Sequence, residues 1–152
     1  MSGTVDVLLA ASLLLFASIY LGTGWSLVLF SFPLAPRLTP DTYHLPFVEP
    51  VRNATRFFTV MTAAMLVASA VLVFRAGDDL WMPLSYLVAT VAATALTLVF
   101  IFPYNKELSG GVRDADRLRE VLGRWMRLNV VRVSLWTVQW AVVAVWFVLE
   151  VV

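Results

Sequence analysis

The sequence predicts an all-α integral membrane protein, folded as a four-transmembrane-helix bundle in a single domain over residues 1–152. Of these 152 residues, 61% are hydrophobic and 14% are charged, whereas soluble domains average about 45–50% apolar and about 25% charged residues. Four apolar runs each reach the roughly 20 residues that a helix needs to cross a hydrocarbon core about 30 Å thick. An open sheet would leave backbone groups unpaired in lipid, so the spans are expected to be helices.

The four spans are predicted at about residues 5–32, 54–74, 80–102 and 128–151. The first run begins MSGTVD without a basic leader and shows no clear small-residue cleavage site, so we expect it to be retained rather than removed as a signal peptide. Pro50 suits the first turn of the second span, and Pro83 suits the first turn of the third.

The first and third spans close with the same Phe-x-Phe-Pro ending, in LVLFSFP at 27–33 and TLVFIFP at 97–103. Proline lacks a backbone donor and restricts the residue before it, so each ending predicts a helix boundary. The repetition favours two parallel helical hairpins, related either by duplication or by convergence.

An amphipathic helix is predicted over about 114–126, after SGG at 109–111 breaks the chain. Its apolar positions recur at helical spacing: Leu118, Val121, Leu122 and Trp125. This helix either docks on the bundle as an extension of the fourth span or lies along the membrane surface.

Basic residues gather in the loops 33–53 and 103–127, the second of which holds six Lys or Arg side chains. The opposite side has Arg75 beside two aspartates. The positive-inside rule therefore predicts a multi-pass protein of the cell (inner) membrane, with both loops cytoplasmic and both termini outside. Acids and bases alternate in the second loop as on a solvated face, so no nucleic-acid partner is expected.

The chain has no cysteine and a single histidine, His44. Iron–sulfur clusters, thiolate zinc sites, disulfides and CxxCH haem attachment are thereby excluded, so no metal or covalently attached haem is expected and the cofactor is left open. His44 is either an interfacial loop residue or a ligand or proton donor. Mid-span carboxylates are absent from the sequence, which disfavours a proton- or ion-coupled transporter.

One face of the predicted fourth helix is both polar and aromatic. Its members follow at spacings of three or four: Trp125, Asn129, Arg132, Trp136, Gln139 and Trp140. The third span ends with Tyr104 and Asn105 at the same depth, and GTGWS at 22–26 holds two glycines that allow close approach of a helix or a flat ligand. We therefore predict a partly polar, ring-lined cavity in the cytoplasmic half of the bundle.

Arg132 has three interpretations, because a charge near the bilayer interior costs roughly 2.5–3.5 kcal/mol without water or a partner. It lies about 6 Å along the helix beyond Leu128, so it can snorkel to the headgroups while Asn129 caps its stem. It can instead pair in the interior with Asn105 or Glu49. In the third interpretation it binds a ligand or takes part in catalysis.

FPYNKEL, followed some twenty residues later by RWMRLNVVR, resembles the anthrone oxygenase-like family of small four-helix membrane proteins, whose bacterial members are mostly catalogued as a domain of unknown function. The family pattern joins a Pro-x-Asn turn to a Trp, then a His or Asn, then an Arg. It falls here on Pro103, Asn105, Trp125, Asn129 and Arg132. GTGWSLVLFSFPLAP is also similar to the family's first span.

The resemblance implies binding or oxidation of a quinone-sized aromatic, which in the family is an anthrone oxidised to an anthraquinone. It makes Arg132 and Asn129 the catalytic pair that stabilises an enolate. The ligand contacts it implies are Asn105, Tyr104, Trp125 and Trp136.

Many family members carry histidine where this chain has Asn129. A neutral amide cannot act as a general base near pH 7. A base would then have to come from Tyr104, His44 or Glu49.

A function of another class fits the same sequence: a noncatalytic accessory or structural subunit of a larger membrane complex, such as a pigment or electron-transfer assembly. The expected partners across both functions are the lipid bilayer, an aromatic or quinone-like small molecule, and a homo-oligomer or larger membrane complex.

Overall fold

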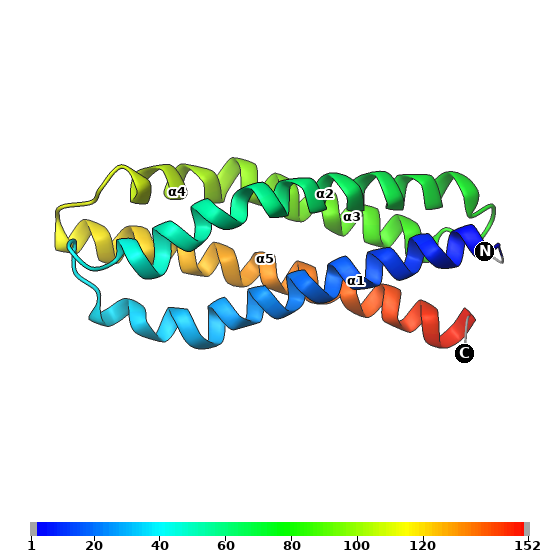
Figure 1. Ribbon diagram of the computed structural model, residues 1–152, viewed down its shortest axis with the longest axis horizontal. Coiled ribbons are helices and arrows are strands. Elements are labelled where there is room, and N and C mark those ends of the chain that lie inside the picture. The colour runs from blue at the N-terminus through cyan, green and yellow to red at the C-terminus, as the bar shows by residue number, and fades with distance from the viewer. Residues whose placement is uncertain (1–2, 151–152) are drawn as a thin grey trace.

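The computed structural model describes residues 3–150 and shows an all-α bundle of long helices (Figure 1). Four helices within these residues are long and apolar enough to cross a membrane: Thr4–Arg37, His44–Arg75, Trp81–Ser109 and Ala115–Leu149. The predicted fold class is confirmed, and the protein is a multi-pass membrane protein. Residue 151, where the fourth span was predicted to end, lies outside the described residues.

The helices contain several shorter turns, denoted η. In chain order the elements are α1 (Thr4–Ser26), η1 (Leu27–Ser31), η2 (Phe32–Arg37), η3 (His44–Val48), α2 (Glu49–Arg75), α3 (Trp81–Leu96), η4 (Thr97–Ile101), α4 (Phe102–Ser109) and α5 (Ala115–Glu150).

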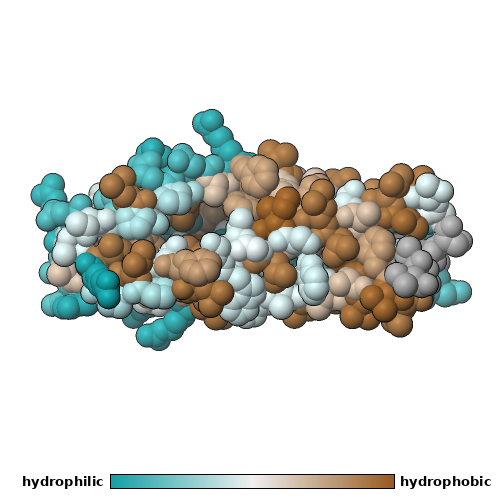
Figure 2. All heavy atoms as spheres, turned by 60° about the horizontal axis from the view of Figure 1, so that its bottom comes forward, coloured by the Kyte–Doolittle hydropathy of each residue, from teal (hydrophilic) through white to brown (hydrophobic). Residues whose placement is uncertain are grey.

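The long helices form a four-membered ring, in which α1 and α3 each pack against both α2 and α5. The helix pairs α1 with α2 and α3 with α5 are thus two hairpins running the same way. The start of α1, the end of α5 and the turn between α2 and α3 lie at one end of the bundle (Figure 1). The connections from α1 to α2 and from α4 to α5 lie at the opposite end. Hydrophilic residues gather at that opposite end, the basic-loop end, while apolar residues dominate toward the termini (Figure 2).

The helices do not stop at the Phe-x-Phe-Pro endings, which corrects the boundaries predicted there. In both copies a π turn precedes the proline: the N–H of Phe32 donates to the carbonyl of Leu27, and the N–H of Phe102 donates to that of Thr97. A π turn inserts one extra residue into the helix. Proline in the middle of an α-helix clashes with the carbonyl four residues back, and we attribute the continuation of both helices to the altered pairing at these π turns.

The segment predicted as an amphipathic helix is the first third of α5, continuous with the fourth span. Its apolar side chains Leu118, Val121, Leu122 and Trp125 are all buried, so it is a docked extension rather than an arm on the membrane surface. Asp114 caps its start by accepting a hydrogen bond from the Arg117 N–H over 2.7 Å.

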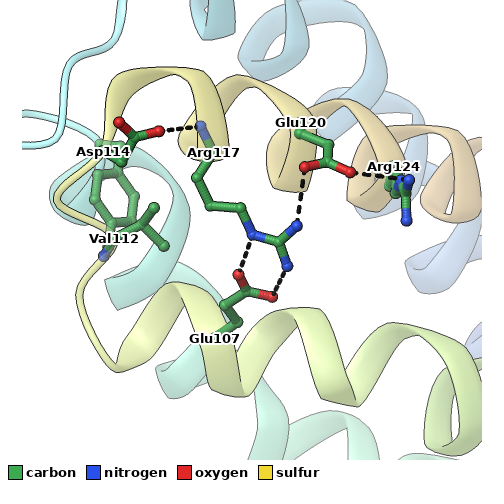
Figure 3. Close-up of polar contacts among 7 residues, drawn as sticks. Glu107, Val112, Asp114, Arg117, Glu120 and Arg124 are labelled. Atoms are coloured by element: carbon green, nitrogen blue, oxygen red, sulfur yellow. Dashed lines mark hydrogen bonds and ion pairs between the residues drawn. The ribbon is translucent and has the colours of Figure 1, made fainter.

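An ion-pair network joins α4 to this part of α5 (Figure 3). The guanidinium of Arg117 donates to both carboxylate oxygens of Glu107, over 2.7 and 3.0 Å, and to Glu120 over 2.9 Å. Glu120 also pairs with Arg124 over 2.9 Å. The two-pronged contact fixes the relative rotation of α4 and α5 at the basic-loop end.

Tyr43 lies in the interior of the basic-loop end and is completely buried. Its hydroxyl donates to the carbonyl of Leu108 and accepts from the N–H of Val112, each over 2.8 Å. Because those two residues flank the turn between α4 and α5, one side chain holds the loop before α2 and the turn before α5 together.

The buried apolar side chains form two separate clusters. The cluster nearer the termini includes Leu13, Met65, Tyr86 and Trp146. The cluster at the basic-loop end includes Tyr43, Phe47, Leu118 and Trp125. The candidate site lies between them.

Candidate functional site

A cavity of about 550 Å³, which we call the central cavity, is lined by side chains from α1, α2, α3, the η4–α4 segment and α5. Tyr20 and Trp136 belong to the apolar cluster on one side of it, and Trp125 belongs to the cluster on the other. The volume lies in the range of about 300–1,000 Å³ that small-molecule sites occupy. The predicted ring-lined, partly polar cavity is thus present.

Threonines supply much of the polarity of the cavity, but little of their hydrogen-bonding capacity is free. Thr55, Thr59, Thr90, Thr94 and Thr97 line the cavity and each donates its hydroxyl proton to the carbonyl four residues earlier. These walls therefore offer oxygen lone pairs to a ligand but few donors.

Arg132 supplies the donor capacity that the threonines lack. Its guanidinium donates to Asn129 Oδ1 and lies 4.7 Å from the ring centroid of Trp136, while its Nε is buried without a hydrogen-bond partner. Among the side chains that the structure describes, no ion pair joins Arg132 to a carboxylate. A cation with spare N–H groups thus lines a largely apolar cavity.

Asn129 holds the guanidinium rather than lining the cavity. Its side chain is fully buried, and its Nδ2 donates to the carbonyl of Trp125 over 2.8 Å, which turns Oδ1 toward Arg132. Among the described residues, the hydrogen-bond partner of Arg132 is Asn129, and neither Asn105 nor Glu49 pairs with it as the alternative interpretation expected. Asn105 accepts from the indole of Trp125 over 2.7 Å, and Glu49 pairs with Arg52 over 2.6 Å.

Trp136 is fixed from the side of α1. The ring of Tyr20 packs 4.6 Å from it, and Gly24 leaves room for it, since a Cβ on Gly24 would stand 2.9 Å from its Cε3. Of the two glycines in GTGWS, only Gly24 makes such an approach, as nothing lies within 4 Å of a Cβ built on Gly22.

Gln139 is the polar residue that our sequence-based site assignment missed. It was placed on the correct face of α5, but its burial and its partner across the bundle could not be inferred from its spacing. Its side chain is 1% exposed, and its Nε2 donates to Thr90 Oγ1 over 2.5 Å. Gln139 is among the residues that line the cavity, and its buried Oε1 has no hydrogen-bond partner among the described residues.

Besides Asn129, one residue assigned to the site, Tyr104, lies outside the cavity lining, and so does His44, which was considered as a base. Tyr104 packs against the apolar cluster at the basic-loop end, and His44 stacks on Tyr43 with ring centroids 4.6 Å apart. Neither they nor Glu49 line the cavity, so the residues considered as a base in place of the family's histidine do not lie in its wall. In contrast, Arg132, Asn105, Trp125 and Trp136 all line it.

The cavity opens sideways between α2 and the η4–α4 segment. Thr55 and Thr59 on one side are exposed, as are Leu98 (55%) and Phe102 (39%) on the other, and all four line the cavity. Because these helices are long and apolar enough to cross a membrane, we expect this mouth to face the surrounding lipid.

Comparisons with models of known protein families, with curated proteins and with solved structures found no match. Within residues 3–150, no group of three or more His, Cys, Asp or Glu side chains is arranged to hold a metal ion. The chemistry that these residues offer is recognition of an oxygen-bearing apolar molecule by a guanidinium.

Proposed function

We propose that the central cavity binds a quinone-sized aromatic molecule, with an anionic or carbonyl oxygen of that molecule against Arg132. The observation that carries this proposal is the Arg132 guanidinium, which lines a 550 Å³ cavity with a buried Nε that has no hydrogen-bond partner. Burying an uncompensated charge is costly. An acceptor oxygen from a ligand would lower that cost by a charge-assisted hydrogen bond.

The rest of the lining suits the body of such a ligand. Trp125 and Trp136 line the cavity from α5, and Phe58 and Met65 line it from α2, so much of the lining is aromatic or apolar. Aromatic rings pack on one another in offset or edge-on contacts worth about 0.5–1.5 kcal/mol beyond area burial. A flat apolar molecule with one strong acceptor is therefore the ligand class that fits this cavity.

Resemblance to the anthrone oxygenase-like family supports the same ligand class, since the residues that carry it include Asn105, Trp125, Asn129 and Arg132. The proposal is limited to binding. Among the described residues, neither a carboxylate nor an imidazole lines the cavity, so a general base for removing a carbon-bound proton is not in place. In this cavity Arg132 would stabilise negative charge on a ligand oxygen.

The test is native mass spectrometry of the protein released from its own membrane in mild detergent. A reproducible small aromatic adduct should be present in the wild type and lost in Arg132→Ala. Arg127→Ala is the matched control, because Arg127 is exposed on the same helix and does not line the cavity. A stoichiometric complex with other proteins, without an adduct, would favour the accessory-subunit function instead.

A further inference from the structure

Gln139 carries a buried acceptor that no other residue described by the structure uses. Its side chain is 1% exposed, and Oε1 has no hydrogen-bond partner among the described residues. Leaving a buried acceptor unpaired costs about 1–3 kcal/mol, so such groups usually have a partner in the working protein. Trp146 Nε1 is also buried without a partner, but Trp146 does not line the cavity.

The hydrogen-bond network decides which amide atom of Gln139 is free. Thr90 has one hydroxyl proton, and it donates that proton to the carbonyl of Tyr86 over 2.8 Å. With that proton on the Tyr86 carbonyl, Thr90 Oγ1 accepts from Gln139, which assigns the atom 2.5 Å away as the Nε2 donor. The remaining atom, Oε1, is an acceptor and needs a donor.

Gln139 and Arg132 line the same cavity and offer complementary hydrogen-bonding groups. They lie seven residues apart on α5, which is two helical turns or about 10 Å along the axis, and thus on the same face. Both line the central cavity. Arg132 offers N–H donors on a cation, and Gln139 offers a neutral acceptor.

We propose that Gln139 is a specificity-determining residue, which selects ligands that carry a hydrogen-bond donor at the end remote from the oxygen bound by Arg132. This inference rests on the proposed function and refines its ligand class. The favoured molecule is an elongated aromatic with an oxyanion at one end and a hydroxyl at the other. Thr90, the direct neighbour of Gln139, does not substitute for it in this role, because Thr90 Oγ1 is already paired on both sides.

The experiment compares three probes on the full-length protein in lipid nanodiscs: 2-naphthoate, 6-hydroxy-2-naphthoate and 6-methoxy-2-naphthoate. All three carry the anion, but only the second carries a distal donor. Binding is followed by energy transfer from tryptophan to the naphthalene, with empty nanodiscs as the blank. We expect the 6-hydroxy probe to bind about three- to tenfold more tightly than 2-naphthoate, and the 6-methoxy probe to show no such gain.

Two variants test whether the Gln139 acceptor causes the higher affinity for the 6-hydroxy probe. Gln139→Met keeps the side-chain volume but removes Oε1, so the gain should vanish while 2-naphthoate still binds. Thr90→Val removes the partner of Nε2 but leaves Oε1 in place, so the 6-hydroxy probe should still bind more tightly than 2-naphthoate. If Gln139→Met does not bind 2-naphthoate, Gln139→Asn replaces it, since it withdraws the acceptor by one carbon, and the same loss is expected.

The outcomes separate this inference from the function it rests on. If no naphthoate binds in a way that Arg132→Ala abolishes, the proposed function fails. If 2-naphthoate binds through Arg132 but the hydroxyl brings no gain, or the gain survives in Gln139→Met, then the role of Gln139 is overturned while the anion site stands.

Discussion

Gly24 lies directly against Trp136, so closely that a Cβ on the glycine would stand 2.9 Å from Cε3 of the indole and 2.7 Å from Cγ2 of Val133. This approach brings α1 onto α5 at the level of the central cavity. Because the same indole lies 4.7 Å from the guanidinium carbon of Arg132, the α1–α5 contact also fixes where the charge sits.

Gly24→Ala should therefore destabilise the bundle by about 1–3 kcal/mol, since a methyl group there overpacks the helix contact. Titration with dodecyl sulfate, followed by circular dichroism, measures the change in the free energy of unfolding. Gly22→Ala is the matched control and should leave that free energy unchanged or slightly raised, because its Cβ meets open space. Equal effects of the two substitutions would contradict the close contact.

Tyr43→Phe should cost about 1–3 kcal/mol, because removing the hydroxyl leaves the buried Val112 N–H without its partner and leaves the Leu108 carbonyl with the Gly111 N–H at 3.3 Å. The same unfolding titration measures it. Tyr104→Phe removes an equal hydroxyl from a half-buried tyrosine nearby and should change the stability much less. A comparable loss in both variants would count against the role given to Tyr43.

Asn129→Asp should weaken binding of 2-naphthoate by about tenfold or more, because a carboxylate at this position would pair with Arg132 and compete with the ligand oxygen. Energy transfer in nanodiscs measures the dissociation constant. Asn53→Asp adds the same charge at an exposed position on α2 and should leave the affinity unchanged. Tighter binding in Asn129→Asp would rule out an anion site at Arg132.

Thr59→Trp should abolish naphthoate binding by filling the side mouth, because Thr59 is exposed and lines the cavity. Val60→Trp is the control, since Val60 is 72% exposed and faces away from the lining. Both variants add the same indole to neighbouring positions of α2. Unchanged binding in Thr59→Trp would show that the ligand does not reach the cavity by this route.

The four spans and the polar face of α5 were predictable because hydropathy and helical spacing are local properties of the sequence. The predicted boundaries at Pro33 and Pro103 failed for a local reason as well. A proline inside an α-helix clashes with the preceding turn, which is why a boundary was predicted at each one. Both helices continue through π turns that depend on a single shifted hydrogen bond, and the sequence pattern does not predict that shift.

The partners in the candidate site were harder to predict, because they depend on how helices face one another. Asn129 was expected to cap the stem of Arg132, and a contact three residues apart on one helix is readily inferred. The bond from Gln139 to Thr90 crosses from α5 to α3, so only the packing of the bundle reveals it. The position of Tyr43 against the α4–α5 turn was missed for the same reason.

The division of the buried side chains into two clusters bears on how the bundle opens. Elements that share few apolar contacts can exchange their amide hydrogens in separate cooperative steps. We expect the basic-loop end, held by Tyr43 and the Arg117 network, to form one such unit and the helix halves nearer the termini to form another. A molecule bound in the central cavity would contact both, so it should merge the two exchange steps into one and slow the faster of them.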